Sequence, residues 1–164
     1  VNGGNGQLAG TYTVGGAARP FDAEAKSWLA KMLSQAVSNG FEARTRAVQI
    51  IRRRGAAAAL IGEIPRLNGD HTKRIYLEEA VKSENLGADA LREVYQLAGR
   101  EISSDYEKAT LLVSALGKSP SDKNSLDAYF AAAGTIKSDY EHARVLKAVL
   151  KANPAAAARA MNFT

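Results

Sequence analysis

The segment ISSDYEKA at residues 102–109 recurs as IKSDYEHA at residues 136–143, a displacement of 34 residues. The similarity continues downstream, where Leu112 and Leu116 match Leu146 and Leu150. Self-similarity at a fixed period of this length indicates stacked units, because one such unit cannot bury its apolar face alone. The repeat therefore predicts where each unit begins, and it does not by itself identify what the stack binds.

Both copies contain the spacing Ser-x-x-Glu, which is typical of a capping box at a helix N-terminus. In that motif the serine hydroxyl accepts the backbone N–H three residues on, and the glutamate reaches back to the serine N–H. The sequence thus predicts that Ser104 and Ser138 are N-caps, with Asp105 and Asp139 favoured in the first turn by the helix dipole. Two identical carboxylate pairs also argue against a catalytic dyad, which needs one arrangement with unequal pKa values.

A second helix precedes each capping box. Its positions are Leu91, Val94, Tyr95 and Ala98 in one copy, and Ser125, Ala128, Tyr129 and Ala132 occupy the equivalent places in the next. The tyrosines after the caps, Tyr106 and Tyr140, are expected to pack between helices with their polar tips exposed. Two helices in each period of 34–35 residues predict an α-solenoid.

Weaker copies extend the pattern in both directions. LNGDH at residues 67–71 aligns with residues 102–106, and NGFE at residues 39–42 starts a still weaker copy, whose second helix is expected over residues 56–67. Pro154 suits the first turn of one more helix over residues 154–159. Four helix pairs, the last incomplete, would account for residues 41–164.

The N-terminal part has a different character. Residues 1–10 are rich in glycine and asparagine and are expected to form a mobile tail or a loop entering a strand. Thr11–Val14 alternates as a short strand does, and a glycine pair follows it. A helix with one apolar stripe is predicted after Pro20, capped by Asp22 and ended by Asn39-Gly40. We therefore expect two parts: residues 1–19 as flexible tail with an extended or hairpin segment, and residues 20–164 as helical-repeat domain.

The repeats resemble HEAT-like helix pairs, since the Trp…Leu-Gly…Tyr pattern of tetratricopeptide repeats is absent. Together with PFDAEA at residues 20–25 and the Trp28-Leu29 pair, they are similar to short helical repeats appended to bacterial proteins. Some of those proteins resemble extracytoplasmic portions of membrane-anchored regulators of the antibiotic-sensing metallopeptidase type. The resemblance covers roughly residues 20–154 and implies an all-α solenoid of antiparallel helix pairs in a right-handed stack, in an extracytoplasmic bacterial location, with a cytoplasmic one as the alternative. The His-Glu-x-x-His zinc motif is missing, so it implies no catalysis.

Composition excludes several classes of chemistry. The 164 residues contain no cysteine, which excludes disulfides, thiolate metal sites and cysteine nucleophiles. The two histidines, His71 and His142, occupy non-equivalent repeat positions, so no shared metal site is predicted. His71 is expected to be partly buried and His142 exposed. No phosphate-loop motif and no apolar run of about 18 residues occurs, so we expect no cofactor, no transmembrane segment in this chain and no enzymatic activity.

The charged residues are distributed unevenly along the chain. Residues 41–75 hold eight basic and three acidic residues, while the rest of the chain holds 14 of each, so the net charge of +5 lies in this window. The candidate contact residues are Arg44, Arg46, Arg52, Arg53, Arg54, Arg66, Lys73 and Arg74. The sequence favours a non-enzymatic interaction or scaffold module of a larger bacterial protein, whose partner is a protein. The alternative is binding of nucleic acid or another polyanion through the basic window 44–74. A solvated face with no binding role is the simplest explanation of these charges.

Overall fold

The computed structural model describes residues 2–4, 7–9, 11–54, 57–84, 86–118 and 123–154. Internal contacts divide the chain into two units, Val1–Val37 and Ser38–Thr164. This division falls later than the boundary after residue 19 that we expected, because the first helix belongs to the N-terminal unit. The expected further helix over residues 154–159 lies outside the described residues, apart from Pro154.

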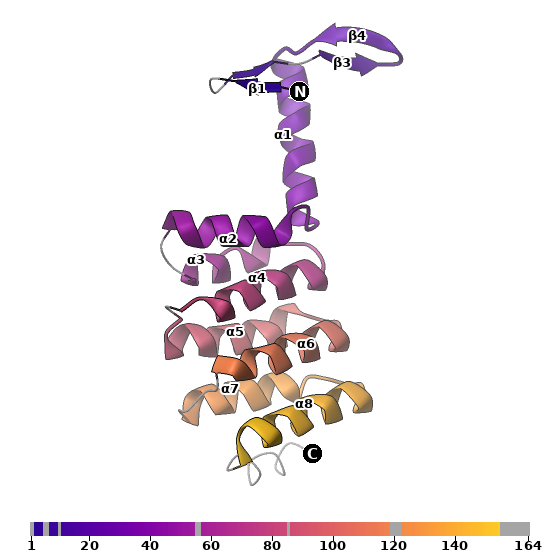
Figure 1. Cartoon of the computed structure of the whole chain (residues 1–164). Coiled ribbons are helices and arrows are strands. Elements are labelled where there is room, and N and C mark those ends of the chain that lie inside the picture. Colours follow the sequence, from indigo (N-terminus) through magenta and orange to yellow (C-terminus); the bar gives the residue numbers. More distant parts are fainter. Residues whose placement is uncertain are drawn as a thin grey trace. The chain divides into compact units, whose positions relative to one another are not determined.

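The N-terminal unit consists of two short antiparallel hairpins and one helix (Figure 1). The first hairpin pairs β1 (Asn2–Gly4) with β2 (Gln7–Ala9), and the second pairs β3 (Thr11–Val14) with β4 (Ala17–Pro20). The strand at residues 11–14 and the glycine turn are confirmed, and Gly15 and Gly16 have positive φ values of 59° and 83°. The prediction of a tail over residues 1–10 is wrong for the described residues there, since backbone pairing orders them as strands.

Helix α1 (Ala23–Ser38) begins as the sequence predicts. The Asp22 carboxylate accepts the backbone N–H of Ala25 at 3.0 Å, and Gly40 ends the helical stretch with a φ of 94°. The apolar stripe of α1 is largely uncovered: Trp28 is 58% exposed, and Met32 and Leu33 are exposed as well. Ala25 is the buried residue of this helix.

Every regular element among the described residues of the second unit is a helix or a 3₁₀ turn. Its elements are α2 (Ala43–Arg54), α3 (Ala58–Ile61), the 3₁₀ turn η1 (Ile64–Arg66), α4 (Asp70–Lys82), α5 (Ala88–Glu101), α6 (Asp105–Ala115), the 3₁₀ turn η2 (Leu116–Lys118), α7 (Lys123–Ala133) and α8 (Asp139–Ala152). Helices α2, α4, α6 and α8 contact one another in that order, while α3, α5 and α7 form a second row (Figure 1). The predominantly helical fold is thus confirmed. The helix expected over residues 56–67 is broken into α3 and η1, with Pro65 inside the 3₁₀ turn.

The core lies between the two rows, and the repeated tyrosines of α5 and α7 are central to it. Tyr95 and Tyr129 are fully buried, with ring centroids 5.3 Å apart in an edge-to-face arrangement. Phe130 continues the contact at 5.8 Å from Tyr129. The two helices approach closely where Gly99 faces Ala132, because a Cβ at Gly99 would lie 3.3 Å from the Ala132 Cα. All eight repeat positions named for these two helices in the sequence, Ser125 among them, are buried.

Both predicted serine caps are confirmed. The Ser104 hydroxyl accepts the Glu107 N–H and the Ser138 hydroxyl accepts the Glu141 N–H, each at 3.4 Å. The reciprocal half of the capping box is wrong. The Ser104 N–H donates at 2.6 Å to Asp70, and the Ser138 N–H donates at 2.9 Å to an aspartate of the preceding copy, Asp105. An aspartate from the neighbouring copy therefore replaces the glutamate, which leaves the glutamate free to pair elsewhere.

Replacing Ser104 or Ser138 by alanine is expected to lower the free energy of unfolding by about 0.5–2 kcal/mol, because one first-turn N–H loses its acceptor. Chemical denaturation followed by far-ultraviolet circular dichroism measures the loss. Ser114, whose hydroxyl donates to a carbonyl inside α6 at 2.8 Å, is the matched control. Its alanine variant should change stability less than either cap variant, and equal losses at all three positions would contradict the capping role.

Three expectations about single side chains need correction. Tyr106 and Tyr140 do not pack between helices, since they are 58% and 75% exposed. The ring of Tyr106 instead lies under the Arg144 guanidinium, 5.5 Å from its centroid. The His71 side chain is 65% exposed rather than partly buried. His142 is half-buried rather than exposed, and its Nε2 atom is shielded from solvent. The position of a residue within the repeat thus predicts where it lies along its helix better than it predicts whether its side chain is buried.

Candidate interaction surface

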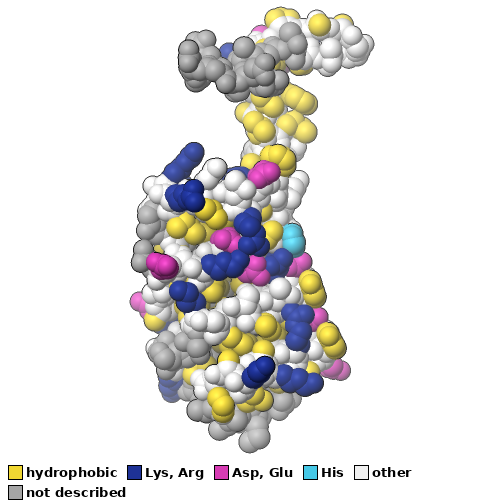
Figure 2. Space-filling view, in the orientation of Figure 1, with side chains coloured by type: hydrophobic (Ala, Val, Ile, Leu, Met, Phe, Trp, Pro, Cys, Tyr) yellow, Lys and Arg dark blue, Asp and Glu magenta, His cyan; other side chains and the backbone are white. Residues whose placement is uncertain are grey.

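The eight basic residues of the window do not form one continuous patch. Five are on α2, one is in η1 and two are on α4. Figure 2 shows Lys and Arg side chains spread over the visible face of the helical unit, with acidic side chains among them. Three of the residues are held in ion pairs between helices, four are exposed at the C-terminal end of α2 and in η1, and Arg46 is half-buried apart from both groups. The two groups have different chemistry available to them.

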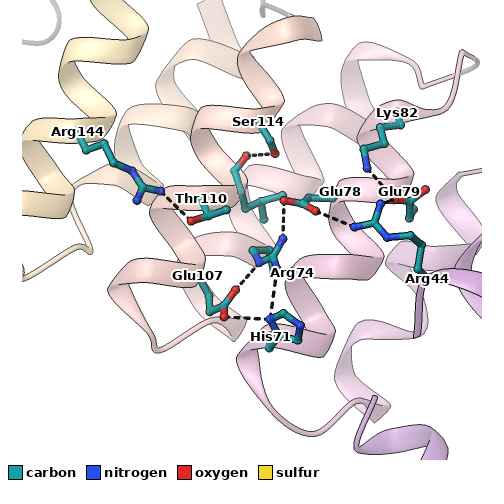
Figure 3. Close-up of polar contacts among 11 residues, drawn as sticks. Arg44, His71, Arg74, Glu78, Glu79, Lys82, Glu107, Thr110, Ser114 and Arg144 are labelled. Carbon is teal, nitrogen blue, oxygen red and sulfur yellow. Dashed lines mark hydrogen bonds and ion pairs between the residues drawn. The ribbon is translucent and has the colours of Figure 1, made fainter. Parts of the chain in front are cut away.

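Arg74 is at the centre of the ion-paired group (Figure 3). Its guanidinium contacts Glu78 on the same helix at 2.6 Å and the Glu107 carboxylate of α6. The His71 Nδ1 atom lies 3.1 Å from the other oxygen of Glu107. The side chains of Arg74, Glu78 and Glu107 are each less than 15% exposed. This cluster joins α4 to α6, and its basic member is not available to a ligand.

Electrostatic effects in the cluster favour the charged forms. Burial opposes ionisation of Glu107, but hydrogen bonds from Arg74 and His71 lower the pKa of that carboxyl below its usual value. Burial likewise opposes the charge of Arg74, yet its bonds to Glu107 and Glu78 raise the pKa of the guanidinium. The pair therefore remains ionised around neutral pH. A carboxylate held in this form has no proton to donate, so Glu107 is a structural partner and not a general acid.

Arg44 extends the cluster to α2. It lies 2.6 Å from Glu79 and 3.8 Å from Glu78, both on α4, and Lys82 also contacts Glu79 at 2.8 Å. Figure 3 shows the Arg44 side chain from α2 and the Lys82 side chain from α4 meeting at the Glu79 carboxylate of α4. The Arg44 side chain is about half exposed, so the pair contributes modestly to stability. Its charge is nevertheless balanced by two carboxylates.

Lys73 belongs to the internal group as well. Its ammonium donates at 2.8 Å to the Glu101 carbonyl at the C-terminus of α5 and lies 3.5 Å from the carboxylate of the same residue. Lys108 of the next copy makes the equivalent contact with Thr135, at 2.7 Å to the hydroxyl and 3.4 Å to the carbonyl. Burial lowers the pKa of Lys108, partly offset by Asp105 and Asp70. A positive charge near a helix C-terminus interacts favourably with the helix dipole, as Lys73 does at the end of α5 and Lys108 just beyond the end of α7.

The remaining arginines form an exposed group, which we call the arginine cluster: Arg52, Arg53, Arg54 and Arg66. Glu63 lies 3.4 Å from Arg54 and 3.6 Å from Arg66, so one carboxylate is shared by two guanidinium groups. Among the described residues, Arg52 and Arg53 have no carboxylate within ion-pair distance. Arg46 is separate, because it is half-buried and its Nη1 atom is shielded from solvent. The arginine cluster thus keeps a net positive charge on an accessible surface.

The N-terminal unit has its own hollow of about 730 Å³. It lies between the second hairpin and α1, and its lining includes Tyr12, Val14, Glu24 and Trp28. The lining is mainly apolar, and Glu24 is the one carboxylate among the described residues that line it. A single carboxylate without a partner base or nucleophile provides no acid–base pair there. Within the described ranges, no three His, Asp or Glu side chains are grouped closely enough to hold a metal ion.

The sequence reasoning missed the acidic half of the ion-paired group. The spacing of Arg74 and Glu78, four residues apart on a helix, is a signal that was available. The contacts of Glu79 and Glu107 were not, because they join helices about one repeat apart. The basic window is therefore an incomplete guide to the exposed charge.

No family model, curated protein or solved structure matches this chain. Over the part that the structure describes, every helix is too short or too polar to cross a bilayer.

Proposed function

We propose that the protein is a non-enzymatic interaction or scaffold module, built as a HEAT-like α-solenoid of antiparallel helix pairs and part of a larger bacterial protein. The repeated contacts between copies support this reading. Asp70 and Asp105 cap the following copies, and Lys73 and Lys108 bind the C-terminal ends of the following tyrosine-bearing helices. Each copy contacts its neighbour through the same positions, as the repeats of solenoid proteins do.

The arginine cluster is the surface that we assign to the partner. The single observation that carries this assignment is its uncompensated charge: of four exposed arginines, Arg54 and Arg66 share the Glu63 carboxylate, and Arg52 and Arg53 contact no carboxylate among the described residues. Arginine presents five N–H donors in a planar fork that fits carboxylates. An acidic protein surface is the partner that such a group recognises. Of the other four basic residues of the window, Arg44, Lys73 and Arg74 are occupied within the fold, and Arg46 is half-buried.

Binding of the full chain to a fluorescent polyglutamate peptide and to a 20-base-pair random duplex tests this proposal. We expect binding to polyglutamate at low salt and a loss of tenfold or more when all four arginines of the cluster are replaced by glutamine. The matched control replaces Arg92 and Arg100, two arginines on α5 that already contact carboxylates. Equal binding by both variants would remove the arginine cluster from the proposal.

The duplex measurement addresses the polyanion alternative. Affinity for DNA should fall steeply with salt, because each phosphate contact releases counterions. Duplex binding tighter than polyglutamate binding, with that salt dependence and lost in the cluster variant, would establish the alternative instead. No aromatic residue stands between the cluster's arginines in the sequence. Proteins that bind single-stranded nucleic acid stack its bases on aromatic side chains, so this composition favours the acidic protein partner.

A further inference from the structure

Four aromatic side chains occupy corresponding places in successive copies of the repeat. His71, Tyr106 and Tyr140 are each the second residue of their helix, in α4, α6 and α8. Phe41 lies two residues before the start of α2. All four side chains are more than half exposed, although large aromatic residues usually contribute to cores and interfaces. An exposed ring at the same place in each copy is therefore a candidate contact for a partner.

The four rings follow one edge of a row of helices. The helices beside them contact one another in the order α2, α4, α6 and α8. Contacts across the row are made next to the rings: the His71 Nδ1 atom lies 3.1 Å from Glu107, the residue after Tyr106. The Arg144 guanidinium of α8 lies 5.5 Å from the centroid of the Tyr106 ring (Figure 3 shows both side chains reaching α6). We call this surface the aromatic edge, and its residues are Phe41, His71, Tyr106 and Tyr140.

The spacing of the rings selects the conformation of a peptide that can contact several of them. Packed helices lie roughly 8–10 Å apart, and rings at the same helical position are separated by about the same distance. One face of an extended strand repeats every two residues, or about 6.6–6.8 Å, which is too short. Two turns of an α-helix span about 10.8 Å, which is too long. A polyproline II helix repeats every three residues, or about 9.3 Å, which matches the rings.

The charges beside the rings are mainly acidic. A carboxylate adjoins each ring in the sequence, and none of the four is buried: they belong to Glu42, Asp70, Asp105 and Asp139. Of the neighbouring cations, Arg144 is paired with Glu141 at 3.0 Å, and Lys137 is exposed. This surface is complementary to a cationic peptide, and it disfavours the phosphates of a nucleic acid.

We propose that the aromatic edge binds a proline-rich segment of a partner protein in the polyproline II conformation, with basic residues between its prolines. A proline at every third position places one pyrrolidine ring on each aromatic ring, and the basic residues between them face the carboxylates. Aromatic-lined surfaces recognise such segments because the polyproline II helix is already formed before binding. The aromatic edge contains none of the arginines of the arginine cluster, so this inference and the proposed acidic partner can fail separately.

A fluorescent peptide of four Pro-Lys-Ser repeats, titrated with the full chain, is the probe. Its control has the same composition, with the prolines two and four positions apart, so that successive prolines cannot all reach successive rings. We expect the control to bind roughly three- to tenfold more weakly for each ring that it misses, as the loss of an aromatic contact does. Equal affinity of the two peptides would overturn the proposal.

The decisive variants are Tyr106→Ala and Tyr140→Ala. Each should weaken binding of the Pro-Lys-Ser peptide roughly three- to tenfold, and the double variant by the product of the two, because one peptide contacts both rings. Tyr106→Phe keeps the ring and should bind as the original chain does. The matched control is Trp28→Ala, at an exposed aromatic side chain of α1. Unchanged affinity in the tyrosine variants, or an equal loss in Trp28→Ala, would overturn the assignment.

Two further ligands test the chemistry of the occupant. A Pro-Glu-Ser peptide can also bind the arginine cluster, so both peptides are compared in the variant that lacks its four arginines. There the lysine peptide should bind and the glutamate peptide should bind more weakly, and the reverse order would overturn the proposal. Single-stranded oligodeoxythymidine is the nucleic-acid ligand. Binding tighter than that of the lysine peptide and abolished by Tyr106→Ala would assign the aromatic edge to nucleic acid instead.

Discussion

Replacing Tyr129 by alanine is expected to lower the free energy of unfolding by about 3–5 kcal/mol, the cost of removing a large aromatic ring from a packed core. The ring is fully buried and makes edge-to-face contacts with Tyr95 and Phe130. These contacts lie where α5 meets α7, so the loss should weaken the joint between two copies. Urea denaturation followed by circular dichroism measures the change.

Two further variants test which part of the Tyr129 side chain stabilises the protein and whether the effect depends on burial of the ring. The Tyr129 hydroxyl is buried without a hydrogen-bond partner among the described residues, and burial raises the pKa of this phenol. Tyr129→Phe removes that unsatisfied group, so stability should stay the same or rise by up to about 1 kcal/mol. Tyr140→Ala, at an exposed ring, should have little effect. A Tyr129→Phe variant as unstable as Tyr129→Ala would show that the hydroxyl, not the ring, stabilises the core.

Glu107→Gln is expected to lower the free energy of unfolding by about 2–3 kcal/mol, because it leaves the mostly buried Arg74 guanidinium with Glu78 as its remaining carboxylate. The glutamine keeps the size of the side chain and the backbone N–H that the Ser104 hydroxyl accepts. The loss therefore reports on charge pairing and not on the cap. The same urea titration measures it.

The control for Glu107→Gln is Glu93→Gln, at a carboxylate 42% exposed and 3.9 Å from Arg100. Its effect should stay within about 0.5 kcal/mol, as for other exposed pairs. Adding Arg74→Met to Glu107→Gln should cost less than the sum of the two single changes, because the partners are coupled. Additive losses would mean that Arg74 and Glu107 act separately.

The same pair predicts an acid dependence. The folded-state pKa of Glu107 lies below its unfolded value, so its contribution is fully present above that unfolded value, about 4.3. It is lost as pH falls through the lower folded-state pKa. The stability difference between the original chain and Glu107→Gln should therefore shrink below about pH 4. A difference that stays constant down to pH 2 would contradict the pairing.

The helical part of the fold follows from local signals in the sequence. Ser104 and Ser138 could be predicted as helix starts because an N-cap depends only on the serine hydroxyl and a backbone N–H three residues away. Tyr95 and Tyr129 mark buried faces because their apolar neighbours recur at helical spacing. Each of these signals is contained within one helix, so sequence periodicity is enough to predict it.

The candidate surface was predicted less well because its charges are decided between helices. From the sequence alone, Arg44, Lys73 and Arg74 could not be distinguished from the exposed arginines of the cluster. Their partners, Glu79, Glu101 and Glu107, lie 28 to 35 residues away along the chain. The same limit applies to Tyr106 and Tyr140, whose surroundings depend on which copy follows them. The net charge of a sequence window counts its charged residues but does not show which of them pair with carboxylates on other helices.

The bonds from Asp70 and Asp105 set how the molecule opens locally. The N-cap amides of α6 and α8, at Ser104 and Ser138, are held by residues that belong to the preceding copy. A fluctuation that frays the start of α4 therefore also releases the start of α6, one period further along the chain. The repeat in the sequence and the segment that opens together are consequently out of step, and the cooperative unit of this protein spans the junction between copies.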